Sequence, residues 1–257
     1  MSLSFPSPTE PGCSRVQLSC VPKWGTPHFG AGEGSERGTP QGATPIEEPA
    51  QTLPRLLVTG FGPFPGAPEN STETLVRNLA TEPSERFGAS ALRALVLPTD
   101  YRRSWPTLRR AQARFAPDIV LHFGLAMRAR SLILERVAHK RIYPDRPDAA
   151  GFAPASGLAR RTGPETIAST LPVNAIHAAL EQAGFPVSLS DDAGKYVCNA
   201  TLYRSLHSAG SGRSRVVGFV HVPPVDTANF SAGRLFSAAC LILGTASAAW
   251  TAPVSKA

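Results

Sequence analysis

The chain has 257 residues, of which 42% are hydrophobic and 18% charged, and its formal net charge is +7. That length accommodates one domain of ordinary size plus an appendage. No stretch approaches the ~18 consecutive apolar residues of a membrane span, and the N-terminus lacks the basic start and apolar core of a signal peptide. The sequence therefore argues against membrane-spanning and secreted proteins, and we expect a cytoplasmic one.

The first fifty residues differ from the rest in composition and periodicity. They contain many Pro, Gly, Ser and Thr residues and show neither the period of a strand nor that of a helix. Such a segment buries too little apolar surface to offset the entropy lost on ordering. We therefore predict that residues 1–52 form a flexible extension and that residues 53–257 form the folded domain. The extension has more acidic than basic residues, so the positive charge belongs to the domain.

Residues 53–257 alternate between strand-like and helix-like segments. Short apolar runs predict strands at 56–60, 91–98, 118–124, 131–138, 187–190 and 215–223. Helical spacing predicts helices at 71–80, 101–115, 171–184, 196–210 and about 231–249, the first with Ser71 as its N-cap. Alternating strands and helices predict a single α/β domain with a mainly parallel, twisted sheet and helices on both faces.

In such a sheet, ligands bind beyond the carboxyl ends of the strands. The loop 60–66 (GFGPFPG) follows the first strand but lacks phosphate-loop spacing, and its prolines remove N–H donors. Phe61 and Phe64 instead favour an apolar pocket wall for a small flat ligand.

Two further candidates follow later strands. Cys198 is expected about two residues into a helix, where the positive end of the helix dipole lowers a thiol pKa. His221 ends the strand 215–223. With Glu135 to orient the imidazole, these residues have the composition of a cysteine-hydrolase triad. The alternatives are a buried helical cysteine, a core histidine, and an edge-strand glutamate paired with Arg136 or Arg141.

The motifs around these residues occur in a known family. The segments LLVTGFGPFPG, PDIVLHFGLA, LERVA, DAGKYVCN and GFVHVP together resemble pyroglutamyl peptidase type I (pyrrolidone-carboxylate peptidase), a family of cysteine peptidases. The resemblance runs from about residue 55 to residue 224. It implies a phosphorylase/hydrolase-like α/β fold with Cys198 as nucleophile, His221 as base and Glu135 as the residue that orients the histidine.

The resemblance also implies the substrate and its pocket. The substrate would be a peptide with an N-terminal pyroglutamate, cleaved through a thioester without metal or other cofactor. Residues at the family's pocket positions would bind it: Phe61, Phe64, Thr99, Arg146, Tyr196 and Val197. Family members are often tetramers, so a homo-oligomer (tetramer or dimer) is expected.

The chain departs from the family at several positions, most clearly in residues 145–151 (DRPDAAG), where the family has R-I-P-D-N-E-G. Either the family's arginine has moved by one residue, or an aliphatic pocket residue has become Arg146, a charge that pyroglutamate would not favour. Two alternatives therefore stay open: an amide hydrolase of the same fold with altered specificity, and a non-catalytic binding protein that kept the pocket.

The remaining candidates are assigned structural roles. Cys13 and Cys20 are expected to be inert thiols and Cys240 to belong to the core. His122, His177 and His207 are expected to be structural. Arginines at 102, 103, 109, 110 and 114 give one helix a basic face, but no nucleic-acid-binding motif accompanies it. Nucleic-acid and membrane partners are therefore not expected.

Overall fold

The computed structural model describes residues 52–210, 215–225, 227 and 229–252. These residues all belong to one compact unit, Glu48–Ala257. The predicted extension, with Cys13 and Cys20, lies outside the described residues except for residue 52. No helix in the described part of the chain is both long and apolar enough to cross a membrane.

The described residues build a six-stranded sheet with the strand order β2-β1-β3-β8-β4-β7. Its strands are β1 (Arg55–Phe61), β2 (Ala91–Leu97), β3 (Ile119–Leu125), β4 (Leu132–Glu135), β7 (Val187–Ser190) and β8 (Val216–Val222). Neighbours from β2 to β8 pair in parallel, as do β4 and β7, whereas β4 pairs antiparallel with β8. The predicted mainly parallel sheet is confirmed, with the difference that β4 and β7 run opposite to the other strands.

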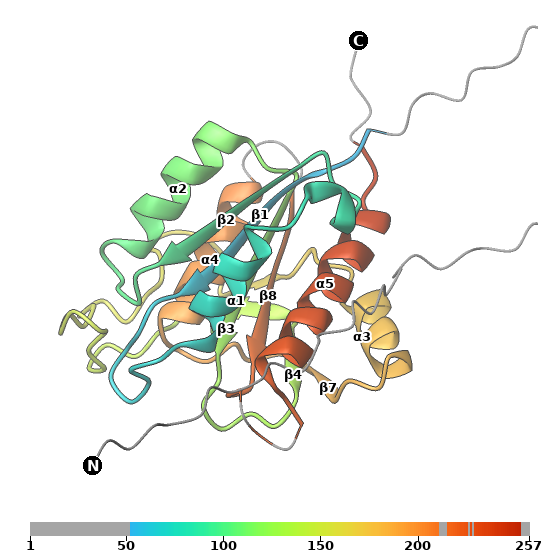
Figure 1. Ribbon diagram of the computed structural model, residues 1–257. Coiled ribbons are helices and arrows are strands. Elements are labelled where there is room, and N and C mark those ends of the chain that lie inside the picture. Colours follow the sequence, from blue (N-terminus) through green and yellow to red (C-terminus); the bar gives the residue numbers. More distant parts are fainter. Residues whose placement is uncertain (1–51, 211–214, 226, 228, 253–257) are drawn as a thin grey trace, which may run out of the picture. The chain divides into compact units, whose positions relative to one another are not determined.

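Helices cover both faces of this sheet, as the sequence predicts (Figure 1). The helices are α1 (Ser71–Leu79), α2 (Ser104–Phe115), α3 (Val173–Gln182), α4 (Val197–Ala209) and α5 (Ala232–Ala248), with a short 3-10 turn, η1 (Ser84–Phe87), after α1. One buried cluster joins the sheet to α1, α3 and α5, and a second joins the opposite face to α2 and α4. The fold is therefore a three-layer α/β domain.

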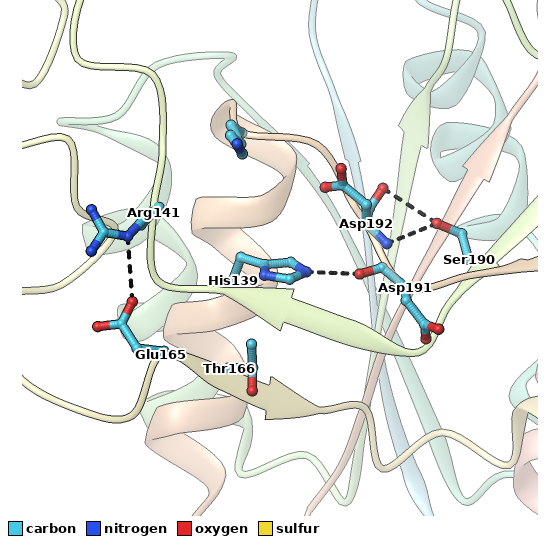
Figure 2. A pocket seen from close by; sticks show the side chains of 8 residues that line it. His139, Arg141, Glu165, Thr166, Ser190, Asp191 and Asp192 are labelled. Atoms are coloured by element: carbon cyan, nitrogen blue, oxygen red, sulfur yellow. Dashed lines mark hydrogen bonds and ion pairs between the residues drawn. The ribbon is translucent and has the colours of Figure 1, made fainter.

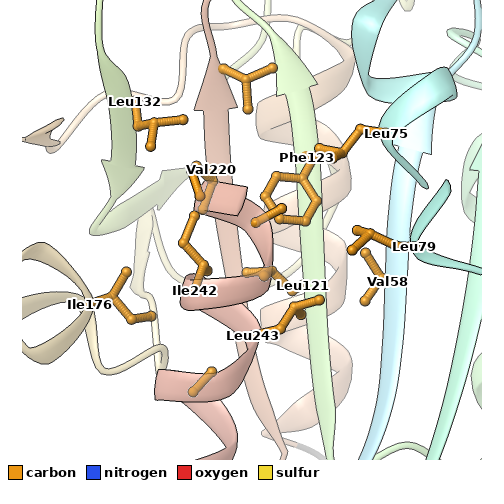
Figure 3. Close-up of a cluster of buried hydrophobic side chains, with 14 of the residues drawn as sticks. Val58, Leu75, Leu79, Leu121, Phe123, Leu132, Ile176, Val220, Ile242 and Leu243 are labelled. Atoms are coloured by element: carbon orange, nitrogen blue, oxygen red, sulfur yellow. The ribbon is translucent and has the colours of Figure 1, made fainter. Parts of the chain in front are cut away.

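Alternate residues of each central strand enter opposite clusters. Leu56 and Val58 of β1 pack on the side of α1 and α5, while Leu57 and Phe61 pack on the side of α2 and α4. Figure 3 shows the first cluster, in which Val58, Leu121 and Val220 of three adjacent strands meet Ile242 and Leu243 of α5. Burial on both faces explains why these strands read as continuous apolar runs in the sequence.

Two local predictions need correction. The N-cap of α1 is Asn70, not Ser71, because the Asn70 side chain accepts the Thr72 N–H at 3.1 Å. The predicted strand 131–138 is two strands, because the chain leaves the main sheet at Arg136. The Arg136 N–H makes the last hydrogen bond to β7, at the Ser190 carbonyl. After it, β5 (Val137–His139) pairs antiparallel with β6 (Thr166–Ala168) in a separate ribbon that the sequence did not predict.

Candidate active site

A tight turn precedes α4 and places Cys198 in the first turn of this helix. The Gly194 N–H donates to the Asp192 side chain at 3.0 Å, and Gly194 has a φ of 77°, which strongly favours glycine. The chain then extends through Tyr196, the N-cap residue, and α4 begins at Val197. Cys198 is thus the second residue of the helix, as its sequence position predicts, and is partly exposed.

The first turn of α4 offers unpaired donors. The side chain of the N-cap residue, Tyr196, makes no capping hydrogen bond. The first hydrogen bond of the helix runs from the Ala200 N–H to the Tyr196 carbonyl at 3.0 Å. Within the described residues, the N–H groups of Val197, Cys198 and Asn199 have no acceptor. Free amides and the positive end of the helix dipole therefore lie in the turn that carries Cys198, and both favour negative charge there.

His221 and Glu135 lie on the same face of the sheet. In the antiparallel pairing of β4 with β8, Glu135 lies opposite Phe219, two residues before His221, so Glu135 is diagonal to His221. Its Oε1 lies 2.7 Å from His221 Nδ1, and Glu135 is only 1% exposed. Because β4 is reversed, Glu135 lies further in along β8 than His221, not beside it at the rim.

The alternative prediction, in which Glu135 pairs with Arg136 or Arg141, is wrong. Arg136 pairs with Asp191, and Arg141 lies 3.5 Å from Glu165. Nor is β4 an edge strand, since β8 and β7 flank it.

The surroundings of His221 favour its charged form. Burial alone would lower the pKa of this imidazole. Hydrogen bonding and charge interaction with Cys198 and Glu135 outweigh burial, and together they raise the pKa of His221 to about 10. His221 therefore carries a positive charge at neutral pH, between the sulfur and the carboxylate. An imidazolium beside a cysteine stabilises the thiolate, the nucleophilic form of the residue.

Gly124 of β3 leaves room for this arrangement. It lies opposite His221 in the parallel pairing of β3 with β8. A Cβ at this position would lie 2.6 Å from the Phe219 ring and 3.2 Å from Cys198 Sγ. The sequence marked Gly124 only as the end of a strand, so its role at the site was missed. A glycine that closes a buried strand next to candidate site residues is the signal that could have found it.

The predicted pocket residues of the β1–α1 loop lie close to this face. Phe61 is buried, with its ring centroid 6.3 Å from that of Phe219, and Phe64 is half-buried in a small turn bridged to Ala67. The Thr99 hydroxyl donates to the Gly62 carbonyl at 2.8 Å. Thr99 therefore holds the phenylalanine loop in place, and its hydroxyl hydrogen is already used.

The remaining predicted pocket residues surround the start of α4. Val197 is fully buried, and the Tyr196 hydroxyl donates to the Pro147 carbonyl at 2.8 Å. The Arg146 guanidinium lies over the Tyr196 ring, 4.7 Å from its centroid, and Arg146 is exposed. Arg146, the arginine that departs from the family pattern, thus lies on the outer side of Tyr196 and not in a closed pocket.

Tyr101, which the sequence did not single out, lies edge-on to Tyr196 with ring centroids 5.7 Å apart. Its N–H donates to the buried Asp148 carboxylate at 2.8 Å. The Tyr101 side chain is buried, and its hydroxyl has no hydrogen-bond partner among the described residues. Burial, and then the neighbouring acidic groups, raise the pKa of Tyr101, so the hydroxyl keeps its proton.

Replacing Tyr101 with phenylalanine is therefore expected to stabilise the protein. A buried polar group without a partner costs about 1–3 kcal/mol, and phenylalanine keeps the ring packing. We expect Tyr101→Phe to raise the free energy of unfolding by about 1 kcal/mol, measured by urea denaturation. A loss of stability of that size would mean that the hydroxyl has a partner in solution.

A separate hollow of about 550 Å³ adjoins the β5–β6 ribbon (Figure 2). None of the triad candidates lines it, and its charged groups largely pair with each other or with the backbone. His139 Nε2 lies 2.7 Å from the Asp191 carbonyl, and Arg141 faces Glu165. In the described part of the chain, no three His, Cys, Asp or Glu side chains are placed to hold a metal ion.

The other histidines take structural positions, as expected. His122 is buried between the Thr59 hydroxyl at 2.7 Å and the Ser205 hydroxyl at 3.0 Å, and burial lowers its pKa to about 3. His177 faces Glu181 one helical turn away, and the His207 ring lies against Tyr203. Cys240 packs against the first buried cluster, as predicted.

The family model and the similar proteins below all belong to one family. The family model described as pyroglutamyl peptidase matches residues 54–245. The pyrrolidone-carboxylate peptidase of Pyrococcus furiosus is 34% identical over 170 residues, which are 66% of this chain and 80% of that protein. That of Clavibacter michiganensis is 36% identical over 172 residues, 66% of this chain and 79% of that protein.

Solved structures agree with this result. The pyrrolidone carboxyl peptidase from Thermococcus litoralis superimposes with a TM-score of 0.70 at 28% identity, covering 76% of this chain and 93% of that one. Pyroglutamyl peptidase I of Bacillus amyloliquefaciens gives a TM-score of 0.68, also at 28% identity, with 76% and 97% covered.

Proposed function

The chain belongs to the pyroglutamyl peptidase family of cysteine peptidases, and we propose that it removes N-terminal pyroglutamate from peptides through a Cys198–His221–Glu135 triad. The observation that carries the proposal is the arrangement around Cys198. A buried carboxylate holds a charged imidazole beside a sulfur, and the sulfur belongs to a helical turn whose N–H groups are unpaired. A nucleophile, its base and donors for an oxyanion are what acyl transfer from an amide requires.

Acylation begins with the Cys198 thiolate beside the His221 imidazolium. The sulfur attacks the carbonyl carbon that joins pyroglutamate to the next residue, and the carbonyl π electrons move to the oxygen. The N–H groups at the start of α4 stabilise this oxyanion. As the intermediate collapses, His221 gives its proton to the departing nitrogen and the C–N bond breaks. The shortened peptide leaves with a free amine, and pyroglutamate stays bound as a thioester.

Deacylation reverses the roles of the same groups. A water molecule attacks the thioester carbonyl while the now neutral His221 takes one of its protons. The C–S bond breaks, pyroglutamic acid leaves, and the thiolate–imidazolium pair is restored. Glu135 holds the imidazole through Nδ1, so that its other nitrogen faces the sulfur and the substrate, and its charge stabilises the imidazolium.

We further propose that the aromatic residues around the triad bind the lactam ring. Pyroglutamate is a small, flat and uncharged group, and aromatic faces suit such a ring. Phe61 is the last residue of β1 and Phe64 lies in the loop after it, while Tyr196 and Val197 stand at the start of α4. Thr99 acts indirectly in this proposal, by holding the Gly62 carbonyl and with it the phenylalanine loop.

Hydrolysis of pyroglutamyl-aminomethylcoumarin, with reductant present, tests the proposal. We expect the wild-type protein and Cys240→Ala, which removes a cysteine remote from the triad, to release coumarin. We expect Cys198→Ala to release none above background. Failure to cleave this substrate while Cys198 is alkylated rapidly near neutral pH would point to a hydrolase of other amides. A sluggish thiol without hydrolysis would overturn the enzymatic assignment in favour of a binding protein.

A further inference from the structure

An exposed cation stands beside the nucleophile's helix. The Arg146 guanidinium stacks on Tyr196, two residues before Cys198, and the Tyr196 hydroxyl binds the Pro147 carbonyl. The loop that carries Arg146 is therefore tied to the segment that carries the nucleophile. Stacking on a ring also restricts the guanidinium to few orientations, which reduces the entropy that binding a ligand would cost.

Arg146 has no ion-pair partner among the described residues, whereas three other cations of the described residues each face a carboxylate. Arg136 pairs with Asp191, and Lys140 and Arg141 both face Glu165. The Arg146 guanidinium stacks on Tyr196 and also lies within electrostatic range of Tyr101.

The carboxylates nearest in sequence do not neutralise this charge. Asp148 is buried, and its two oxygens accept the N–H groups of Tyr101, Ala150 and Phe152. Asp145 is exposed and makes no ion pair in the described part of the chain. The guanidinium therefore keeps its donors available beside Tyr196.

Lys195 adds a second positive charge in the segment that leads to Cys198. It is exposed, its Nζ lies 6.0 Å from the centroid of the Tyr143 ring, and it has no ion pair within the described residues. Its carbonyl accepts the Tyr143 N–H at 2.8 Å, which joins this segment to the loop that carries Arg146. Lys195 also lines the hollow beside the β5–β6 ribbon, together with Asp191 and Asp192, so Arg146 is the stronger candidate for binding a charged ligand at Tyr196.

The position of Arg146 indicates which part of a substrate would meet it. The group bound as an acyl-enzyme must be enclosed near the sulfur, whereas the leaving peptide extends from the scissile bond toward solvent. Arg146 is exposed on the outer side of Tyr196. A partner for its charge therefore belongs to the leaving peptide and not to the pyroglutamyl ring.

We propose that Arg146 binds a carboxylate of the leaving peptide, so that peptides with Glu or Asp directly after pyroglutamate are preferred substrates. This inference rests on the proposed function. Guanidinium groups bind carboxylates through two parallel N–H donors, a geometry that an amide side chain in the substrate cannot match. Because the site is open to solvent, the preference should be moderate and sensitive to salt.

The test compares two matched internally quenched peptides that begin pyroglutamyl-Glu and pyroglutamyl-Gln and are otherwise identical. We expect the wild-type kcat/KM to favour the Glu peptide by about tenfold at low salt, and the ratio to shrink in 0.5 M NaCl. Arg146→Gln should bring the ratio close to one, whereas Lys195→Gln removes a charge from the lining of the separate hollow and should change the ratio little. Arg110→Gln removes an exposed charge on α2, whose guanidinium contacts only its own helix, and should leave the ratio unchanged.

Uncharged pyroglutamyl-aminomethylcoumarin separates this inference from the proposed function. If that substrate is cleaved but wild-type protein treats both peptides alike or prefers Gln, the inference is wrong and the proposed function stands. An Arg146→Gln protein that keeps the tenfold ratio also overturns it, since the preference would then arise elsewhere. If neither the coumarin substrate nor the peptides are cleaved, the proposed function itself fails.

Discussion

Glu135→Gln is expected to lower kcat/KM for pyroglutamyl-aminomethylcoumarin by about two to four orders of magnitude, the range in which loss of the orienting carboxylate of a triad falls. Glutamine keeps the size of the side chain but removes the charge that faces His221 Nδ1 at 2.7 Å. Because Glu135 is 1% exposed, water cannot enter to stabilise the imidazolium in place of the carboxylate. The imidazolium and the thiolate that it stabilises therefore both become less favourable.

The pH profile gives a second readout of the same change. The pKa of His221 is raised to about 10, so the imidazolium persists at neutral pH and is lost as the pH rises through that value. We expect the wild-type kcat/KM to fall on the alkaline side with an apparent pKa near 10. Removing the Glu135 charge takes away part of what raises this pKa, so the alkaline limb of Glu135→Gln should lie at lower pH.

Glu165→Gln is the matched control for this variant. It removes one carboxylate that faces Lys140 and Arg141, away from the triad candidates, and is largely exposed. Its kcat/KM and its alkaline limb should stay close to those of the wild type. A Glu135→Gln protein with kcat/KM within threefold of wild type and an unmoved alkaline limb would show that Glu135 does not act on His221.

Most of the fold could be predicted because the local signals are strong. The runs around Leu57, Leu121 and Val220 are apolar on both sides, as buried parallel strands require. Gly184 lies just beyond the end of α3 with a φ of 75°, the position at which a glycine ends a helix.

Strand direction could not be predicted in the same way. The four residues of β4 carry the same apolar pattern whether they run with or against β8, and the choice depends on pairing with segments far away in the sequence. This matters for the site, because the reversed β4 places Glu135 opposite Phe219 and diagonal to His221. The residue types of the triad candidates were evident from the sequence, but the position of Glu135 relative to the rim was not.

Residues whose role is to leave space or to pack were missed for a related reason. The sequence singles out groups that can react, whereas Gly124 contributes the absence of a side chain and Tyr101 contributes a ring against Tyr196. The clearance at Gly124 depends on the Phe219 ring from the neighbouring strand and on Cys198 from α4, which are brought there only by the tertiary fold.

Gly124→Ala is accordingly expected to impair the site without replacing any reacting group. The added Cβ would lie 2.6 Å from the Phe219 ring, so the ring must move, and His221 lies against that ring with centroids 4.7 Å apart. Cys198 Sγ, at 3.2 Å, would also have to give way. A displacement of about 1 Å in a catalytic group costs about 10²-fold in rate, so kcat/KM should fall by about that factor. Overpacking should also cost about 1–3 kcal/mol of stability.

Gly244→Ala provides the matched control, because a Cβ placed at that position in α5 would meet nothing within 4 Å beyond the backbone of its own helix. Alanine is the better helix former, so this variant should be as stable as the wild type or slightly more stable, with unchanged kcat/KM. Hydrolysis and urea unfolding of the two variants separate general effects of an added methyl group from crowding at the site. Equal activity in Gly124→Ala and wild type would mean that Phe219 can move without carrying His221 with it, and that the geometry of Cys198 and His221 does not depend on the packing beneath them.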